Sequence, residues 1–187
     1  MDTLIRRARV GDALEAVSGL GIWRAQPIEE RVARFVRVVE RMEEGLTLGL
    51  VAERAGAIVG WARTAWFKTP EEPDMVPTGW YLLGLDVRTE QRRQGIGSAL
   101  TDARIAWLRE RAHEVRYFTT PENLPSMALH APYGFVEEAR GLRAPGPGED
   151  LRFVLFLLQF EGQALSDLVP RDGPEHGARG AHVVQGT

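Results

Sequence analysis

The sequence contains no cysteine and only one lysine, Lys68. The lack of cysteine excludes disulfide bonds, thiolate metal ligands and a cysteine nucleophile. No apolar run approaches the roughly 18 residues that a membrane-spanning helix needs. The net charge of −3 argues against a protein that binds nucleic acids by bulk electrostatic attraction. The N-terminal segment lacks the apolar core of a secretory signal peptide, so we expect a cytoplasmic protein.

The remaining composition is ordinary for a soluble globular protein, because 44% of the 187 residues are hydrophobic and 26% are charged. We predict a single domain over residues 1–160. Residues 161–187 are rich in glycine, proline and isolated charges without hydrophobic periodicity, so we predict a C-terminal tail there. His176 and His182 in this tail have no carboxylate or cysteine partners nearby, so we predict no metal site.

Hydrophobic periodicity, with breaks at glycine and proline, predicts a mixed α/β domain with the element order β α α β β β α β α β β. The predicted strands cover Leu4–Val10, two segments within Thr47–Phe67, Trp80–Val87, Glu114–Thr120, Phe135–Ala144 and Asp150–Phe160. The predicted helices cover Asp12–Leu20, Pro27–Gly45, the segment from Gly95 to His113, and a short segment within Pro121–Phe135. This order gives about seven strands and about four helices.

The segment Leu85–Leu100 reads LDVRTEQRRQGIGSAL, in which a strand ends, two glycines follow and a helical pattern begins. The first amides of a helix have no intrahelical partner and carry partial positive charge. Gly95 and Gly97 have no side chains to keep an anion away, and Arg92 and Arg93 can add charge-assisted hydrogen bonds. The pattern therefore predicts a cradle for a phosphate or a pyrophosphate.

Two common phosphate-binding motifs do not match this loop. A dinucleotide fingerprint needs a third small residue, and this sequence has Leu100 at that position. A P-loop needs a lysine after its glycines, and no lysine follows here. The loop therefore either binds a different phosphate compound or only shapes a tight turn between the strand and the helix.

The motif resembles that of the GCN5-related N-acetyltransferase (GNAT) superfamily, in which a hydrophobic-x-Val strand precedes Arg/Gln-x-x-Gly-x-Gly. The strand motif corresponds to Leu85–Val87 and the glycine motif to Arg92–Gly97. The downstream residues that match the family are Asn123, Ser126, His130 and Gly134–Phe135. The resemblance covers the element order from Leu4 to Phe160, and it implies a GNAT-type central sheet with splayed middle strands.

The resemblance also implies acetyl-CoA as the acetyl donor and direct transfer of the acetyl group to an amine. The cofactor-binding residues that it implies are Leu85, Asp86, Val87, Arg92, Arg93, Gln94, Gly95, Ile96, Gly97, Ser98, Asn123 and Ser126. In this scheme the amide of Val87 polarises the thioester carbonyl and stabilises the oxyanion. The coenzyme's pantetheine would fill the gap between the splayed strands.

Proton transfers are less well defined by the resemblance. The family usually has a tyrosine where this sequence has His130, which can either protonate the departing thiolate or form part of the wall. Tyr133 is the fallback proton donor. The strand carboxylate that often serves as the base is missing, so the base is unassigned. Other acids that can bind a cationic substrate or relay a proton are Glu53, Glu71, Glu72 and Asp74.

The acceptor is expected to be a small molecule with a primary amine, because Gly79–Gly97 looks most like the small-amine and aminoglycoside branch. We expect Trp61, Trp80 and Tyr81 to contact it, or else to fill the core. A protein N-terminal or lysine acetyltransferase and a non-catalytic acyl-CoA-binding module stay open as alternatives.

Two further expectations concern the surface. The segment Lys68–Gly79 looks long enough to cover a pocket. The final strand segment, Leu151–Phe160, is apolar over its length, so as an edge strand it would pair within the chain or in a homodimer. We expect no nucleic-acid partner and no membrane partner.

Overall fold

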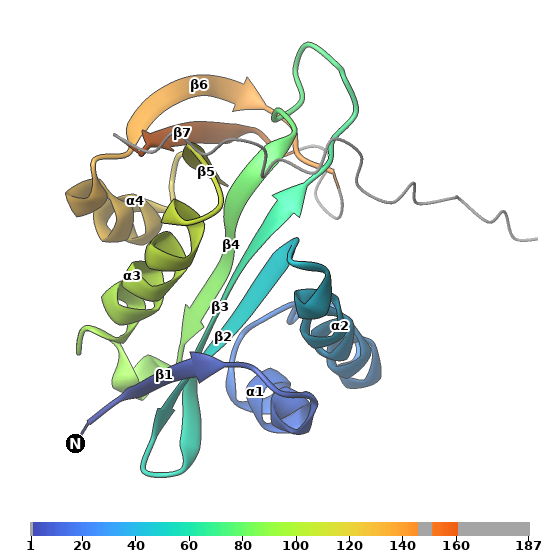
Figure 1. The fold of residues 1–187 in the computed structure, drawn as a ribbon, viewed down its shortest axis with the longest axis vertical. Coiled ribbons are helices and arrows are strands. Elements are labelled where there is room, and N and C mark those ends of the chain that lie inside the picture. The colour runs from blue at the N-terminus through green and yellow to red at the C-terminus, as the bar shows by residue number, and fades with distance from the viewer. Residues whose placement is uncertain (1, 146–150, 161–187) are drawn as a thin grey trace, which may run out of the picture.

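The computed structural model describes residues 2–145 and 151–160 (Figure 1). The predicted tail over residues 161–187, with His176 and His182, lies outside the described residues. The strands are β1 Leu4–Arg7, β2 Thr47–Arg54, β3 Ala57–Phe67, β4 Gly79–Val87, β5 Glu114–Thr119, β6 Val136–Leu142 and β7 Phe153–Gln159. The helices are α1 Ala13–Gly19, α2 Ile28–Glu40, α3 Ile96–Arg109 and α4 Leu124–His130. The predicted order of elements is confirmed.

The local signals in the sequence account for most of the element ends. Helix α2 buries Phe35 and Val38 on its apolar stripe and continues as a 3-10 turn that ends at Gly45. Gly45 has a φ of 74°, a left-handed conformation that favours glycine. Ala55 and Gly56, with φ values of 50° and 78°, form the two-residue turn between β2 and β3.

The seven strands form one sheet in the order β1-β2-β3-β4-β5-β7-β6. Helices α1 and α2 cover one face and α3 covers the other, with α4 beside α3 (Figure 1). Side chains alternate between these faces along β3. Trp61 packs on Phe35 of α2, whereas Ala62 belongs to the cluster beneath α3. In the described part of the chain, no helix is both long enough and apolar enough to cross a membrane.

The two central strands β4 and β5 diverge. They are parallel neighbours and share one register pair, Tyr81 with Arg116. By contrast, β3 pairs with β4 from Phe67–Gly79 to Gly60–Val87, and β5 pairs with β7 from Glu114–Gln159 to Thr119–Val154. The backbone of β4 beyond Tyr81 therefore has no strand beside it on the β5 side, which agrees with the expected splay.

Strand β7 lies inside the sheet, between β5 and β6. The expectation that this apolar segment forms an edge strand is therefore wrong, because both of its edges pair within the chain. The edges of the sheet are β1 and β6. The homodimer stays a prediction, but an unpaired edge of β7 no longer supports it.

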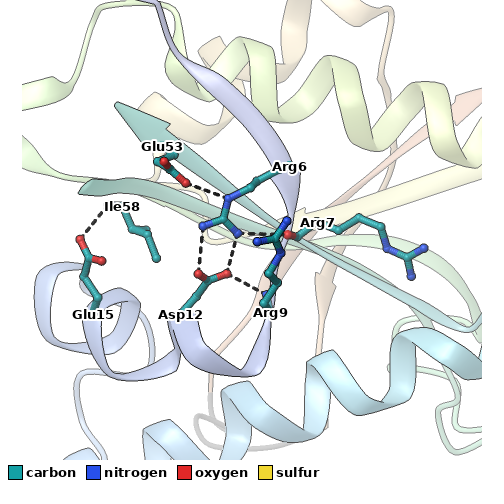
Figure 2. Close-up of polar contacts among 7 residues, drawn as sticks. All are labelled: Arg6, Arg7, Arg9, Asp12, Glu15, Glu53 and Ile58. Carbon is teal, nitrogen blue, oxygen red and sulfur yellow. Dashed lines mark hydrogen bonds and ion pairs between the residues drawn. The ribbon is translucent and has the colours of Figure 1, made fainter. Parts of the chain in front are cut away.

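The N-terminal corner, which consists of Arg6, Asp12 and Glu53, joins β1 to the start of α1 and to β2 (Figure 2). The guanidinium of Arg6 donates to both carboxylate oxygens of Asp12, at 2.8 and 2.9 Å, and to Glu53 at 2.8 Å. These bonds raise the pKa of Arg6. Burial alone would raise the pKa of Asp12, but the hydrogen bonds and charge of Arg6 lower it below its usual value.

Candidate active site

The predicted phosphate loop has a backbone shaped by two left-handed residues. Arg93 has a φ of 61° and Gly95 has a φ of 79°, and Gly95 is the N-cap of α3. No side chain caps this helix, so the amides of Ile96, Gly97 and Ser98 lack an intrahelical partner. Successive backbone amides in such turns form a concave site for anions.

A cavity of about 840 Å³, here called the loop cavity, extends from this loop along β4, β5 and α4. It occupies the gap between the diverging strands. The predicted residues that line it are Leu85, Asp86, Val87, Arg92, Arg93, Gly95, Ile96, Gly97, Ser98, Asn123, Ser126 and His130. Gln94 does not line it, because its side-chain oxygen accepts a hydrogen bond from Arg54 on the other side of the loop.

The two loop arginines differ in what they bind. The Nε of Arg92 donates to the Val87 carbonyl at 2.9 Å, and its Nη2 lies 3.3 Å from the Asp86 carboxylate. Arg92 therefore ties the loop back to β4. Arg93 makes no side-chain hydrogen bond or ion pair with any residue that the structure describes, so its guanidinium is available to an anion in the loop cavity.

The backbone of β4 presents amides to the gap. Arg88 donates its amide to the Val59 carbonyl on β3 at 2.9 Å. Because amides alternate in direction along a strand, those of Leu85 and Val87 face away from β3, toward β5. The Val87 amide, predicted to polarise a carbonyl, donates to the neighbouring Asp86 carboxylate at 2.9 Å. It must leave that carboxylate to bind a ligand.

His130 lines the loop cavity and is buried, stacked on Tyr117 with ring centroids 4.3 Å apart. Its Nδ1 lies 2.9 Å from the Ser126 carbonyl, which can only accept, so Nδ1 carries the proton and Nε2 does not. Burial and the charge of Arg104 lower the pKa of His130 to about 4, despite the bond to Ser126. At neutral pH this imidazole is neutral and Nε2 can only accept a hydrogen bond, which favours the wall role over the proton-donor role, the two roles that the sequence left open.

Tyr133, the predicted fallback donor, lies outside the lining of the loop cavity. Its hydroxyl donates to the Asp102 carboxylate at 2.7 Å, and it lies 3.1 Å from the Ser98 carbonyl. Burial, together with Asp102, raises the pKa of Tyr133 to about 12. This hydroxyl holds the chain after α4 against α3 and does not face a ligand in the cavity.

Arg104 and Tyr117 also line the loop cavity, and the sequence did not predict them as site residues. Arg104 is only 1% exposed and bonds to the Thr101 hydroxyl at 2.9 Å and to the Arg63 carbonyl at 3.3 Å. It has no carboxylate partner among the described residues, and its Nε has no hydrogen bond at all. Burial lowers the pKa of Arg104 to about 9, so the guanidinium is still charged at neutral pH.

A second cavity of about 350 Å³, here called the tryptophan cavity, lies on the α1–α2 face of the sheet. Its lining residues are Gly21, Ile22, Trp23, Trp61, Arg63, Gly84, Leu85 and Asp86. Gly84, Leu85 and Asp86 line both cavities, so the two spaces meet at this short stretch of β4. A β-bulge at Gly84, with a φ of 53°, interrupts the pairing with β3 there.

Of the three aromatic residues predicted to contact an acceptor, only Trp61 lines the tryptophan cavity. Trp80 packs between Trp66 and Trp107 beneath α3. Tyr81 is fully buried, and its hydroxyl donates to the Pro77 carbonyl at 2.6 Å. Trp80 and Tyr81 are therefore core residues and line neither cavity.

Three of the four acids considered as proton relays are held elsewhere, and the fourth, Glu71, lines neither cavity. Glu53 binds Arg6, and Glu72 and Asp74 bind Arg143. The loop that carries Glu72 and Asp74 is fastened to the end of β6 and lines neither cavity, contrary to the expectation that Lys68–Gly79 covers a pocket. Asp86 is the carboxylate common to both cavities, and it accepts from the Gly21 amide as well as from Val87.

Comparison with known proteins agrees with this geometry. The family model described as the acetyltransferase (GNAT) family matches residues 20–135. The chain belongs to the GNAT acetyltransferase family. A comparison of the sequence with curated proteins finds no match.

Solved GNAT structures share the fold over most of the chain. One is yncA of Salmonella typhimurium with its cofactor acetyl-CoA, at 20% identity and a TM-score of 0.66, covering 89% of this chain and 99% of that chain. Another is a ribosomal-protein-alanine N-acetyltransferase of Brucella melitensis, at 27% identity and a TM-score of 0.63, covering 84% and 99%. A third is the PaiA N-acetyltransferase of Thermoplasma acidophilum in complex with coenzyme A, at 16% identity and a TM-score of 0.61, covering 86% and 100%.

GNAT acetyltransferases use acetyl-CoA, and the loop cavity of this GNAT enzyme has the features that such a donor needs. The uncapped amides of α3 and the guanidinium of Arg93 suit a pyrophosphate. A Cβ at Gly97 would lie 3.5 Å from Leu129 and 3.7 Å from Leu85, so any longer side chain there would enter the cavity. The residues present therefore fit the coenzyme.

Proposed function

We propose that this GNAT enzyme transfers the acetyl group of acetyl-CoA directly to the primary amine of a small molecule. The observation that carries this proposal is the meeting of the two cavities at Gly84–Asp86. The coenzyme would enter from the loop cavity and the amine from the tryptophan cavity. The acceptor nitrogen and the thioester carbon would then come together where the two cavities adjoin, at Gly84–Asp86, as a direct transfer needs.

We place the coenzyme on the residues that line the loop cavity. The pyrophosphate would bind the amides of Ile96, Gly97 and Ser98, and the pantetheine would lie along β4 in the gap beside β5. The amides of Leu85 and Val87 face this gap and are the candidates to stabilise the oxyanion. The Val87 amide would exchange the Asp86 carboxylate for the thioester oxygen.

We propose that the carboxylate of Asp86 is the base that accepts protons from the amine. An alkylammonium group with a pKa near 10.4 must lose a proton before it attacks. The nitrogen forms a bond to the thioester carbon, the carbon–sulfur bond breaks, and sulfur keeps the electron pair as a thiolate. The nitrogen would lose two protons in all, one from the ammonium before it attacks and one after it is acylated, and each would pass to the carboxylate of Asp86 and then to solvent.

Arg104 is suited to the negative charge that the reaction creates. The starting thioester and amine are neutral, whereas the departing coenzyme is a thiolate. A buried guanidinium without a carboxylate partner stabilises an anion in the same cavity strongly, because little water screens the interaction there. His130, as an acceptor at Nε2, would bind an amide group of the pantetheine.

The size of the tryptophan cavity favours a small acceptor. Its volume of about 350 Å³ is near the lower end of the roughly 300–1,000 Å³ that ligand pockets span. This supports a small amine over a multi-ring aminoglycoside. A protein N-terminus is the second candidate, because the Brucella structure that is 27% identical is named for a ribosomal-protein alanine. The cytoplasmic location stays a prediction.

The test compares the binding of acetyl-CoA to the wild-type enzyme and to Gly97→Glu by calorimetric titration. We expect micromolar binding to the wild type and none to Gly97→Glu, because the new side chain fills the cavity and repels the pyrophosphate. Gly11→Glu is the matched control, since a Cβ at Gly11 meets no atom within 4 Å and Gly11 lies outside both cavities.

Release of free thiol from acetyl-CoA is then measured with small amines and with peptides that begin with alanine. Turnover of the small amines alone supports the proposal, whereas turnover of the peptides alone selects the second candidate. Wild-type protein that does not bind acetyl-CoA, or a Gly97→Glu variant that binds as tightly as Gly11→Glu, would overturn the assignment of the loop cavity.

A further inference from the structure

The tryptophan cavity contains two opposite charges. Asp86 of β4 stands where the cavity meets the loop cavity, and Arg63 of β3 lines the same space. Trp61 is the register partner of Asp86, and Arg63 lies two residues further along β3. Residues i and i+2 of a strand point to the same face, as do register partners on adjacent strands, so both charges project from the α1–α2 face.

Arg63 has no ion-pair partner within the part of the chain that the structure describes. Its side chain makes no ion pair or hydrogen bond there, whereas its backbone carbonyl accepts from Arg104. Burial, with added repulsion from Arg34 and Arg41, lowers the pKa of Arg63 to about 10, which leaves it charged at neutral pH. A partly buried guanidinium surrounded by cations is unfavourable until an anion joins it.

The neighbouring side chains leave the guanidinium of Arg63 free for a ligand. Arg34 of α2 lies over the Trp23 ring, 4.8 Å from its centroid, and this cation–π contact holds Arg34 beside the cavity wall. Arg41 is engaged by Glu44 at 3.2 Å. Trp23 and Trp61, with ring centroids 6.3 Å apart, form an apolar wall next to Arg63. The cavity thus combines a cationic site, an apolar wall and a carboxylate.

We propose that the acceptor is a small zwitterion, an amino-acid-like molecule whose carboxylate binds Arg63 while its amine lies beside Asp86. This inference rests on the proposed function and names the substrate class of the same site. A guanidinium and a carboxylate form two parallel hydrogen bonds, which fix the orientation of the molecule. The amine is thereby directed at Gly84–Asp86, where the thioester carbon lies.

The experiment measures kcat and KM for amino acids, for their carboxamides and for the matching decarboxylated amines, by thiol release from acetyl-CoA. For the wild type we expect kcat/KM to be about 10- to 100-fold higher for the amino acid than for its carboxamide, the range expected for a charge-assisted hydrogen bond. In Arg63→Gln we expect this ratio to fall to near one, through a higher KM with little change in kcat. Arg63→Lys, which keeps the charge, should retain part of the preference.

Arg7→Gln is the matched control, because Arg7 is exposed on β1 outside both cavities. Calorimetric titration of the same compounds into the enzyme–CoA complex supplies a readout that does not depend on turnover. A wild type that binds and acetylates carboxamides as well as amino acids would overturn the inference. So would an Arg63→Gln variant that keeps the preference and the acetyl-CoA affinity.

The failure of the proposed function has a different signature. If the wild type does not bind acetyl-CoA, the donor site itself is wrong. If acetyl-CoA binds, and amines without a carboxylate are acetylated as well as amino acids are, only the proposal that Arg63 binds the acceptor's carboxylate fails. Thermal unfolding of each variant checks that it is folded. If Arg63→Gln does not fold, the preference for carboxylates is measured in Arg63→Lys instead.

Discussion

The arginine of the N-terminal corner and the arginines of the two cavities differ in how their charge is balanced. Arg6 is enclosed by Asp12 and Glu53, and its guanidinium nitrogens Nε, Nη1 and Nη2 all donate to carboxylates (Figure 2). Arg63, which is partly buried, and Arg104, which is fully buried, have no carboxylate in contact among the described residues. The same side chain therefore occurs in this fold both with its counter-ions and without them.

This difference indicates two roles for arginine: Arg6 stabilises the fold, whereas Arg63 and Arg104 can bind an anionic ligand. A partly buried cation that has two carboxylate partners stabilises the folded chain. A buried cation without a partner lowers stability, and it remains in a fold when a ligand or a reaction supplies the missing negative charge. Of the buried side-chain atoms without a hydrogen bond in the described part, Arg104 Nε and His130 Nε2 both belong to residues that line the loop cavity.

Replacing Arg104 with leucine should give the largest effect. We expect kcat to fall about 100-fold, comparable to the loss of one electrostatic donor in other enzymes. The melting temperature should stay the same or rise, because an apolar residue replaces an unpaired buried charge. Steady-state kinetics and thermal unfolding of Arg104→Leu test this, with Arg109→Leu on the exposed side of α3 as the control. Lost stability with an unchanged kcat would make Arg104 a structural residue.

Replacing Arg6 with leucine should have the opposite consequence. The carboxylates of Asp12 and Glu53 would then lose their shared partner. We expect the free energy of unfolding to fall by about 2 kcal/mol, as for the loss of charge-assisted hydrogen bonds. Activity per folded molecule should not change. Urea unfolding and kcat for Arg6→Leu measure the two quantities, and a drop in kcat without a loss of stability would contradict the comparison.

The smallest effect concerns pH. The pKa of His130 is about 4 in the folded enzyme against an ordinary 6.5, so between these values the unfolded chain binds a proton that the folded chain does not. Stability therefore falls as the pH drops through this window and is fully present above 6.5. We expect wild type to lose about 1 kcal/mol between pH 7.5 and 6 that His130→Gln does not lose. Urea unfolding at several pH values measures this, and parallel profiles for the two proteins would refute it.

The sequence was sufficient for the order of elements because glycine and proline mark most of the turns. Gly45, Gly56 and Gly95 all adopt left-handed conformations at the breaks where the pattern predicts them. The pairing of β7 was not predictable. A mostly apolar run of ten residues is compatible with an inner strand, and equally with an edge strand that another segment covers. Only the long-range pairing with β5 and β6 decides its place.

The site was predictable where it depends on local backbone chemistry. The glycine loop lies on the cavity as expected, because two glycines before a helix are a local signal. The faces of β4 were not predictable, since its apolar residues occur on both sides, and Trp80 and Tyr81 proved to be core residues. One signal for Arg104 was present, because it lies four residues after Leu100 and four before Leu108, on the buried stripe of α3.

The place of β7 has a consequence for the order in which the enzyme is completed during synthesis. Strand β5, one wall of the loop cavity, has one register pair with β4 and six with β7. The family match ends at residue 135, before β7 begins at Phe153. A nascent chain that already carries the glycine loop, Asp86 and His130 therefore still lacks the strand that holds its cofactor wall. Because β7 follows all the other strands in the described part of the chain, we expect the cofactor wall to be completed only after β7 has left the ribosome.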